Sequence, residues 1–121
     1  MTDAELVLRS AYRAFNARDI EAAAERMHPE VDWPNAWEGG RVVGREAVRD
    51  YWARQFLAIS SHVEPERFTE EVDGSTTVEV HQVVHDTETG KLVSDSHVRH
   101  RYRLADGLVV RMDVLQRASS P

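Results

Sequence analysis

The hydrophobic pattern changes its period near residue 60, and this change limits the fold more than any other feature of the chain. Apolar residues recur at helical spacing up to Ile59 and alternate with period two from His62 to Leu115. Three turn signals, Asp73-Gly74, Thr89-Gly90 and Asp106-Gly107, divide the second part into four strands. Helices followed by an antiparallel meander predict an α+β domain whose helices pack on one face of the sheet.

We expect three helices in the first half of the chain. The first covers residues 2–16 and opens with a capping box. Asp19 can cap a second, short helix, which Pro29 stops. A brief extended segment at 31–35 comes next, and the third helix covers residues 45–59.

The composition fits one domain covering residues 1–121, with a short tail at 117–121. The net charge of −6 gives no electrostatic reason to expect nucleic acid or an anionic membrane as the partner. The chain has no cysteine, which excludes disulfides and cysteine-based zinc sites. Because neither a signal-peptide pattern nor an apolar run of membrane-spanning length is found, we expect a cytoplasmic protein.

The even-numbered strand positions are mostly apolar, so we expect them to line the concave, inner face of the sheet. Three-residue hairpin loops would pair even positions with even ones. Arg99 would then lie opposite both Glu79 and Asp113, and this charge ladder supports the register. His100 would lie opposite Met112. The expected inner-face set is Val78, Val80, Gln82, Val84, Val98, His100, Tyr102, Leu104, Leu108, Val110, Met112 and Val114.

Several short motifs, in order, resemble a known family. They are His28-Pro-Glu-Val-Asp-Trp33, then Gly44-Arg-Glu-Ala-Val48, then a segment from His100 to Asp113. The chain resembles the SnoaL-like branch of the nuclear-transport-factor-2-like superfamily over nearly its whole length. The resemblance implies a cone-shaped, curved antiparallel sheet with three N-terminal helices on its concave face. It also implies a small-molecule pocket at the wide end of the cone and, often, a dimer formed through the sheet.

Ketosteroid isomerase is one relative whose functional positions can be compared. The position of its general-base aspartate matches Asn35, and that of its oxyanion-hole aspartic acid matches His100. Its first-helix tyrosine falls near Ala11, one residue from Tyr12. Because an amide cannot accept a proton as a carboxylate does, we do not expect the isomerase mechanism here.

His100, Tyr102 and Asn35 are the candidate catalytic residues. An imidazole on the inner face could transfer a proton near neutral pH, while a phenol and an amide orient or polarise a substrate oxygen. We therefore predict a cofactor-independent acid–base enzyme that cyclises, dehydrates or isomerises a small apolar carbonyl or hydroxyl compound. Two alternatives stay open: a pocket that binds without turnover, and an interaction protein that uses the sheet face and has a collapsed cavity. His100 could also be an inert, hydrogen-bonded core residue.

The candidate substrate-binding residues come from the inner face, the helices and the expected pocket mouth. Trp37 could cover the pocket, and Gln82 is expected to pair with Ser96 across two strands. Asp32 should point outward, although a bulge in its strand would make it a base beside His100. The predicted set is Tyr12, Trp33, Trp37, Trp52, Phe56, Gln82, Ser96, Val98 and Met112.

Histidines also gather on the outer face of the predicted sheet. His81 and His97 face each other, His85 lies on the same strand face, and Asp95 is near. Together they could ligate zinc, but their spacing matches no known motif, and we favour a role in a subunit interface. We therefore predict no metal and no cofactor, and expect a homodimer through the outer sheet face, with a small molecule as ligand.

Overall fold

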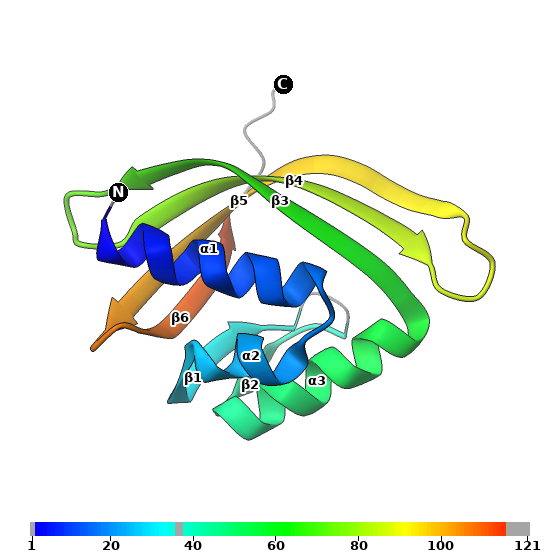
Figure 1. Ribbon diagram of the computed structural model, residues 1–121, viewed down its shortest axis with the longest axis horizontal. Helices are drawn as coiled ribbons and strands as arrows, with labels where there is room; N and C mark the ends of the chain where they lie inside the picture. Colours follow the sequence, from blue (N-terminus) through cyan, green and yellow to red (C-terminus); the bar gives the residue numbers. More distant parts are fainter. Residues whose placement is uncertain (1, 36–37, 116–121) are drawn as a thin grey trace.

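A computed structural model of the chain describes residues 2–35 and 38–115. In these residues a curved sheet arches over the helices, which lie on its concave side (Figure 1). The elements are α1 (Asp3–Asn16), α2 (Ile20–Glu25), β1 (Met27–Pro34), β2 (Arg41–Val43), α3 (Arg45–Ala58), β3 (Ile59–Glu70), β4 (Thr76–Asp86), β5 (Leu92–Ala105) and β6 (Leu108–Leu115). The α+β architecture predicted from the change of period is confirmed. Trp37 and the predicted tail lie outside the described residues.

The first two helices begin at the predicted caps. The Thr2 hydroxyl accepts a hydrogen bond from the Glu5 backbone N–H at 3.1 Å. The Asp19 carboxylate accepts one from the Ala22 N–H, also at 3.1 Å. Each bond satisfies a backbone donor that the first turn of a helix leaves without a partner. Tyr12 lies on the buried face of α1, which packs beneath the sheet.

The sheet has six strands in the order β2-β1-β6-β5-β4-β3, so the predicted four-stranded meander is extended by two strands. β1 pairs in parallel with β6, the free edge of the meander. Pro29 therefore lies within a strand rather than simply ending a helix. The β1–β6 register shifts between Met27 and Asp32, and such an irregularity tolerates a residue without a backbone N–H.

The register between β4 and β5 follows the prediction. Val80 pairs with Val98, and the two outward-facing neighbours Glu79 and Arg99 also pair. Even positions face the helices on both strands, because Val80 is fully buried. The loop between these strands has five residues rather than three. His85 pairs with Leu92 beside this loop, and a register shift between Val84 and His85 restores the pairing of even positions with even ones.

The hairpin between β5 and β6 differs from the prediction. Its loop has two residues, Asp106 and Gly107, both with positive φ (54° and 77°), as the favoured two-residue hairpin turns require. Leu104 consequently pairs with Val109, which is fully buried. A β-bulge then leaves Val110 as an extra residue, so the prediction that Val110 lies on the inner face was wrong.

The two-residue turn and the bulge together move the predicted pairs on β6. Leu108 pairs with Ala105 instead of Leu104, so its predicted place on the inner face was also wrong, whereas Met112 after the bulge keeps its predicted face.

Arg101 rather than Arg99 lies opposite Asp113. His100 lies opposite Val114, two positions beyond the predicted partner. The predicted pairing of Arg99 with Glu79, between β4 and β5, is therefore correct. The predicted pairing of Arg99 with Asp113, between β5 and β6, is wrong by two residues along β5.

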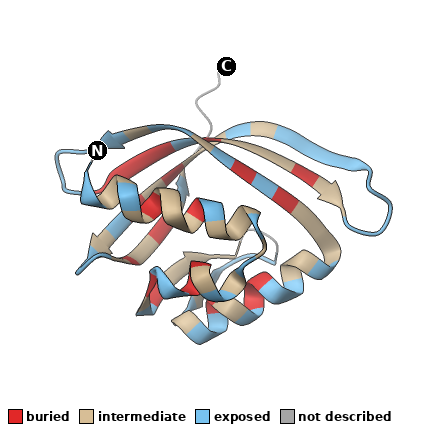
Figure 2. Cartoon of the chain, in the orientation of Figure 1, coloured by how far each residue is buried: buried red, intermediate tan, exposed pale blue. Residues whose placement is uncertain are grey.

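The core lies between the concave face of the sheet and the three helices. Buried residues gather on the surfaces that these layers turn toward each other, whereas the turn between β4 and β5 is exposed (Figure 2). None of the described helices has the length and hydropathy needed to cross a membrane. The buried apolar cluster consists of Leu8, Tyr12, Ala23, Ala24, Met27, Val31, Val48, Tyr51, Trp52, Val63, Val78, Val80, Tyr102, Val109 and Met112.

Candidate functional site

A cavity of about 160 Å³ lies between the sheet and helices α1 and α3. Apolar and aromatic side chains make up most of its wall, and Val114, which is 46% exposed, lines it where it meets the solvent. The lining residues are Ala11, Tyr12, Phe15, Met27, Trp33, Pro34, Tyr51, Trp52, Gln55, Ser61, Val63, Gln82, His100, Tyr102, Met112 and Val114. The cavity is thus an apolar pocket with a few polar groups, the usual composition of a small-molecule site.

A chain of buried hydrogen bonds joins three of the lining residues. The Tyr102 hydroxyl donates to the Tyr12 hydroxyl oxygen, with 2.8 Å between the oxygens. The Tyr12 oxygen lies 2.8 Å from His100 Nδ1. All three side chains are buried, and His100 is 7% exposed. Tyr12 on the inner face of helix α1 and the two residues on the inner face of β5 therefore form a hydrogen-bonded polar cluster surrounded by apolar residues.

The positions of the protons follow from this chain. A tyrosine hydroxyl has one hydrogen, and Tyr102 already donates to the Tyr12 oxygen. The hydrogen of Tyr12 is therefore free to point at His100 Nδ1, which accepts it. In a neutral imidazole the proton then resides on Nε2. His100 can offer this Nε2–H as a hydrogen-bond donor to a molecule in the cavity.

Burial keeps all three groups uncharged. Loss of solvation lowers the pKa of His100 from 6.5 to about 4. Burial also raises the pKa of Tyr12 and of Tyr102, because a phenolate would be unsolvated there. His100 is consequently neutral at neutral pH. It is a weaker base than the sequence analysis assumed, and a good neutral donor.

Three further polar side chains line the cavity, namely Gln55, Ser61 and Gln82. They come from α3, β3 and β4 respectively, so polar groups approach the cavity from several directions. None of the lining residues in the described part of the chain is an aspartate or a glutamate. The chemistry that these residues can supply is hydrogen bonding to an oxygen in a largely dry space.

The structure brings together most of the predicted pocket residues. Seven of them line the cavity: Tyr12, Trp33, Trp52, Gln82, His100, Tyr102 and Met112. Trp37 lies outside the described residues. The other four are not among the lining residues: Asn35, Phe56, Ser96 and Val98.

Asn35 is the predicted catalytic residue that the structure places elsewhere. Its side-chain oxygen accepts a hydrogen bond from the Glu38 backbone N–H at 2.8 Å. Its side-chain nitrogen donates to the Glu38 carboxylate at 3.1 Å. Both polar atoms of the amide therefore stabilise the turn after β1. Asn35 is not among the residues that line the cavity.

The remaining differences have equally local causes. Phe56 packs its ring 4.9 Å from that of Phe15 and so supports the wall from behind. Ser96 pairs with Gln82 as predicted, but only Gln82 of this pair lines the cavity. Asp32 points outward, as expected, and binds Arg41 and Arg111 there.

The sequence analysis did not include two polar lining residues. Gln55 lies one turn after Tyr51 on α3, and this spacing could have placed it on the inner face. Ser61 is buried and lies before the predicted start of its strand, because β3 begins at Ile59 rather than at His62. Strand alternation traced back from Val63 would have placed Ser61 inward.

Comparison with known proteins agrees with this fold. A sequence model described as the SnoaL-like domain matches residues 8–112. The chain therefore belongs to the SnoaL-like domain family. A search of curated proteins gives no match.

Several solved structures have the same fold at low sequence identity. TerC, co-crystallised with polyporic acid, is 22% identical with a TM-score of 0.80, covering 94% of this chain and 91% of that one. RV0760c from Mycobacterium tuberculosis, in complex with estradiol-17β-hemisuccinate, is 19% identical with a TM-score of 0.83, covering 98% and 96%. A nuclear-transport-factor-2-like protein from Burkholderia pseudomallei is 20% identical with a TM-score of 0.81, covering 95% and 91%.

Proposed function

We propose that the protein binds a small, largely apolar molecule in this cavity and holds a carbonyl or hydroxyl oxygen of it against His100. The observation that supports this most is the hydrogen-bond chain from Tyr102 through Tyr12 to His100 Nδ1. The chain leaves Nε2–H as the donor for a ligand. A neutral donor in a site that excludes water interacts strongly with an oxygen on which negative charge develops.

The size of the cavity restricts the ligand to about one ring. A dry apolar cavity of about 150 Å³ is known to accept benzene, and this one measures about 160 Å³. TerC and RV0760c were crystallised with ring compounds, polyporic acid and an estradiol derivative. A larger molecule would place one ring in this cavity and leave the rest outside, near Val114.

The reaction that we propose is cofactor-independent acid–base chemistry on such a compound, of the cyclisation, dehydration or isomerisation type. Hydrogen bonding from His100 to a ketone oxygen would stabilise the charge that develops there when a neighbouring C–H gives its proton to a solvent hydroxide ion or water. Solvent is the proton acceptor in this step because the described lining residues include no carboxylate. We expect Gln82 to orient the same molecule, because it lines the cavity on the adjacent strand.

Binding without turnover is the second candidate, and one observation favours it. The described lining residues include no carboxylate, and the pKa of His100 is lowered to about 4. A group with so low a pKa is a weak general base at neutral pH. The alternative is thus a module that recognises the oxygen of its ligand and leaves the ligand unchanged.

A matched pair of ligands tests the binding proposal. Acetophenone and ethylbenzene share a phenyl ring and a two-carbon side chain, but only the ketone has an oxygen that can accept a hydrogen bond from His100. Isothermal titration calorimetry should show tighter binding of the ketone. His100→Phe keeps a planar ring without the donor, and it should weaken ketone binding roughly 3- to 10-fold while leaving ethylbenzene unaffected. Equal effects on both ligands would refute the role of His100.

Proton exchange then separates the two candidates. In D₂O, an enzyme that promotes enolisation should exchange the methyl protons of acetophenone, which NMR detects directly. His100→Phe should abolish this exchange. Binding of the ketone without exchange would support the non-catalytic alternative.

We further propose that two copies associate through the outer face of the sheet, as the family resemblance implies. This face has charged groups of both signs in neighbouring rows, for example the pair of Glu79 and Arg99. The cytoplasmic location expected from the sequence stays a prediction.

A further inference from the structure

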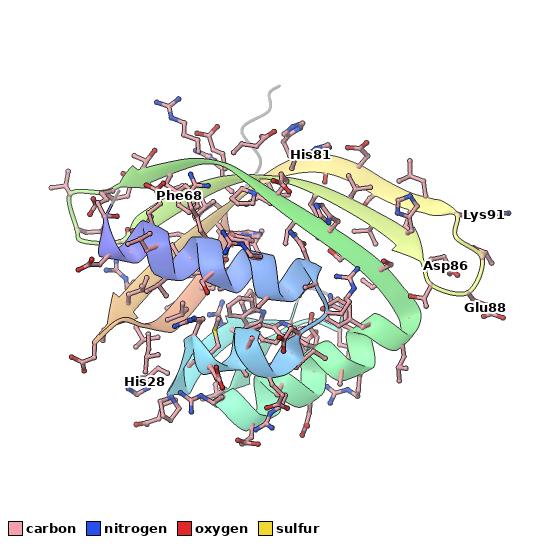
Figure 3. The ribbon with its side chains drawn as sticks, in the orientation of Figure 1. His28, Phe68, His81, Asp86, Glu88 and Lys91 are labelled. Atoms are coloured by element: carbon pink, nitrogen blue, oxygen red, sulfur yellow. The ribbon has the colours of Figure 1, made fainter. Side chains whose placement is uncertain are left out.

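A second group of possible ligand atoms lies on the face of the sheet that points away from the cavity. Glu66 of β3, His81 of β4 and His97 of β5 each offer one nitrogen or oxygen atom, and these atoms lie within 4.8 Å of one another. Figure 3 shows His81 on the convex side of the sheet, away from the helices. This group shares no residue with the cavity.

The two histidines are held together by the register of their strands. His81 and His97 are directly opposed on β4 and β5, and their rings stack with centroids 4.6 Å apart. His81 Nε2 lies 2.6 Å from a carboxylate oxygen of Asp95, on the same strand as His97. His97 Nε2 lies 3.6 Å from a carboxylate oxygen of Glu66. Each imidazole therefore has a carboxylate beside it.

A β-bulge brings Glu66 to this position. Pro65 pairs with Val80 and Arg67 pairs with Glu79, which leaves Glu66 as an extra residue on β3. Arg67 points outward, because it lies 3.8 Å from Glu79. Glu66 also points outward, toward His97. The bulge thus places two consecutive side chains on one face, and bulges of this kind often redirect a side chain to a site.

We propose that Glu66, His81 and His97 form a binding site for a divalent transition-metal ion such as Zn²⁺, with Asp95 as an additional or alternative carboxylate ligand. Two imidazoles and a carboxylate are a common protein ligand set for zinc, with bonds of about 2.0–2.2 Å. Tetrahedral bonds of that length place ligand atoms roughly 3.4 Å apart. Small rotations of these side chains would bring them to that spacing, and their exposure permits such rotations.

The ligand chemistry also defines the selectivity. Imidazole nitrogens favour Zn²⁺, Cu²⁺ and Ni²⁺ over Mg²⁺ and Ca²⁺, which prefer sites made only of oxygen. Calorimetric titration with ZnCl₂ should give one ion per chain, and MgCl₂ should give no binding. Co²⁺ substitution should produce the visible absorption of a four- or five-coordinate ion.

His28 provides a matched control. It lies on the opposite side of the molecule from His81 (Figure 3), and its Nδ1 accepts a hydrogen bond from the Glu30 backbone N–H. His28→Gln retains an acceptor for this bond and removes one imidazole, as His97→Gln does. The two variants therefore differ in the location of the lost histidine rather than in composition.

Loss of a ligand should weaken zinc binding about tenfold or more for His81→Gln or His97→Gln, and less for Glu66→Gln because Asp95 can replace it. His28→Gln should bind zinc as the unaltered protein does. The melting temperatures without metal should be nearly the same for all variants, because none of the altered side chains is buried. Dissociation constants above about 1 mM for the unaltered protein, or equal affinity in the His81→Gln/His97→Gln double variant, would overturn the proposal.

Discussion

At the scale of single residues, His100 shows how burial changes the role of a side chain. The sequence pointed to a proton-transferring base on the inner face of the sheet. The structure places the imidazole there, but without a charged partner among the lining residues, so its pKa falls to about 4. The nitrogen that could accept a proton already accepts a hydrogen bond from Tyr12. The group of His100 that remains available to a ligand is the Nε2–H hydrogen-bond donor.

The lowered pKa of His100 predicts how stability depends on pH. The unfolded chain binds a proton at this residue below about pH 6.5, and the native protein does so only below about pH 4. Between these values the unfolded state holds more protons, so acidification destabilises the protein, by up to about 3 kcal/mol from this group. Urea denaturation between about pH 6.5 and pH 4 should show this loss of unfolding free energy.

His100→Gln supplies the comparison, because glutamine does not titrate. Other histidines and carboxylates contribute equally to the pH dependence of both proteins. The variant should be less stable at neutral pH but should lose less stability toward pH 4. If the free energy of unfolding changed with pH in the same way in both proteins, the assignment of a buried, neutral His100 would be contradicted.

The middle member of the hydrogen-bond chain should matter more than its end. Tyr12→Phe removes the donor to His100 and the acceptor for Tyr102, leaving two buried polar groups without partners. Tyr12→Phe should therefore lower the free energy of unfolding by roughly 2 kcal/mol or more. Tyr102→Phe removes a donor but leaves the bond from Tyr12 to His100, and should cost about 1 kcal/mol. Chemical denaturation measures both, and the reverse order would refute the central place of Tyr12 in the chain.

At the scale of elements, a single asparagine joins helix α1 to the sheet. The side-chain nitrogen of Asn16 donates to the Val63 carbonyl at 2.8 Å, and its oxygen accepts from the Val63 N–H at 2.9 Å. The amide thus binds β3 as a neighbouring strand would. Since Tyr12 is one turn earlier on the same helix, this contact also fixes the position of the hydrogen-bond chain.

Replacing this asparagine should loosen the helix from the sheet. Asn16→Ala removes two hydrogen bonds to one backbone position and should destabilise the fold by about 2 kcal/mol. Arg13→Ala, on the exposed side of the same helix, should change stability by less than about 0.5 kcal/mol. Denaturation midpoints compare the two. Similar losses in both variants would mean that helix propensity, rather than the Asn16 contact, holds α1.

The elements also show why the sequence predicted some features of the site and not others. The face on which His100 and Gln82 lie follows from alternation along each strand, which is a local pattern. The bulges at Glu66 and Val110 each add one residue to a strand, and neither residue type marks them in advance. Asn35 was assigned from its position in a family, whereas a turn with Glu38 determines its contacts.

At the scale of the whole molecule, one sheet separates two different environments. The concave face encloses the cavity with His100 in its wall, and the convex face carries rows of charged side chains and the histidine pair. The proposed ligand and the proposed second copy therefore use opposite faces. Each proposal can be tested without disturbing the other.

A change of charge on the convex face tests the proposed dimer. Glu79 lies opposite Arg99 and 3.8 Å from Arg67, so Glu79→Arg would place like charges on three neighbouring strands. Sedimentation velocity should show a weaker dimer, and thermal denaturation a lower melting temperature. Glu25→Arg makes the same change of charge on helix α2 and should affect neither. An unaltered dimer and melting temperature in the Glu79 variant would refute this role of the face.

The hairpin between β5 and β6 links chain length to the contents of the cavity. Its short turn would by itself rotate every later side chain of β6 to the wrong side, and the extra residue Val110 cancels that rotation before Met112. Deleting Val110 alone should therefore expel Met112 from the cavity wall, whereas deleting it and adding one residue after Gly107 should restore the wall. A longer turn at Asp106-Gly107 combined with the loss of the bulge at Val110 would leave the fold almost unchanged. Proteins with this cavity can therefore differ in the number of residues between the turn and the bulge and still have the same residues in the cavity wall.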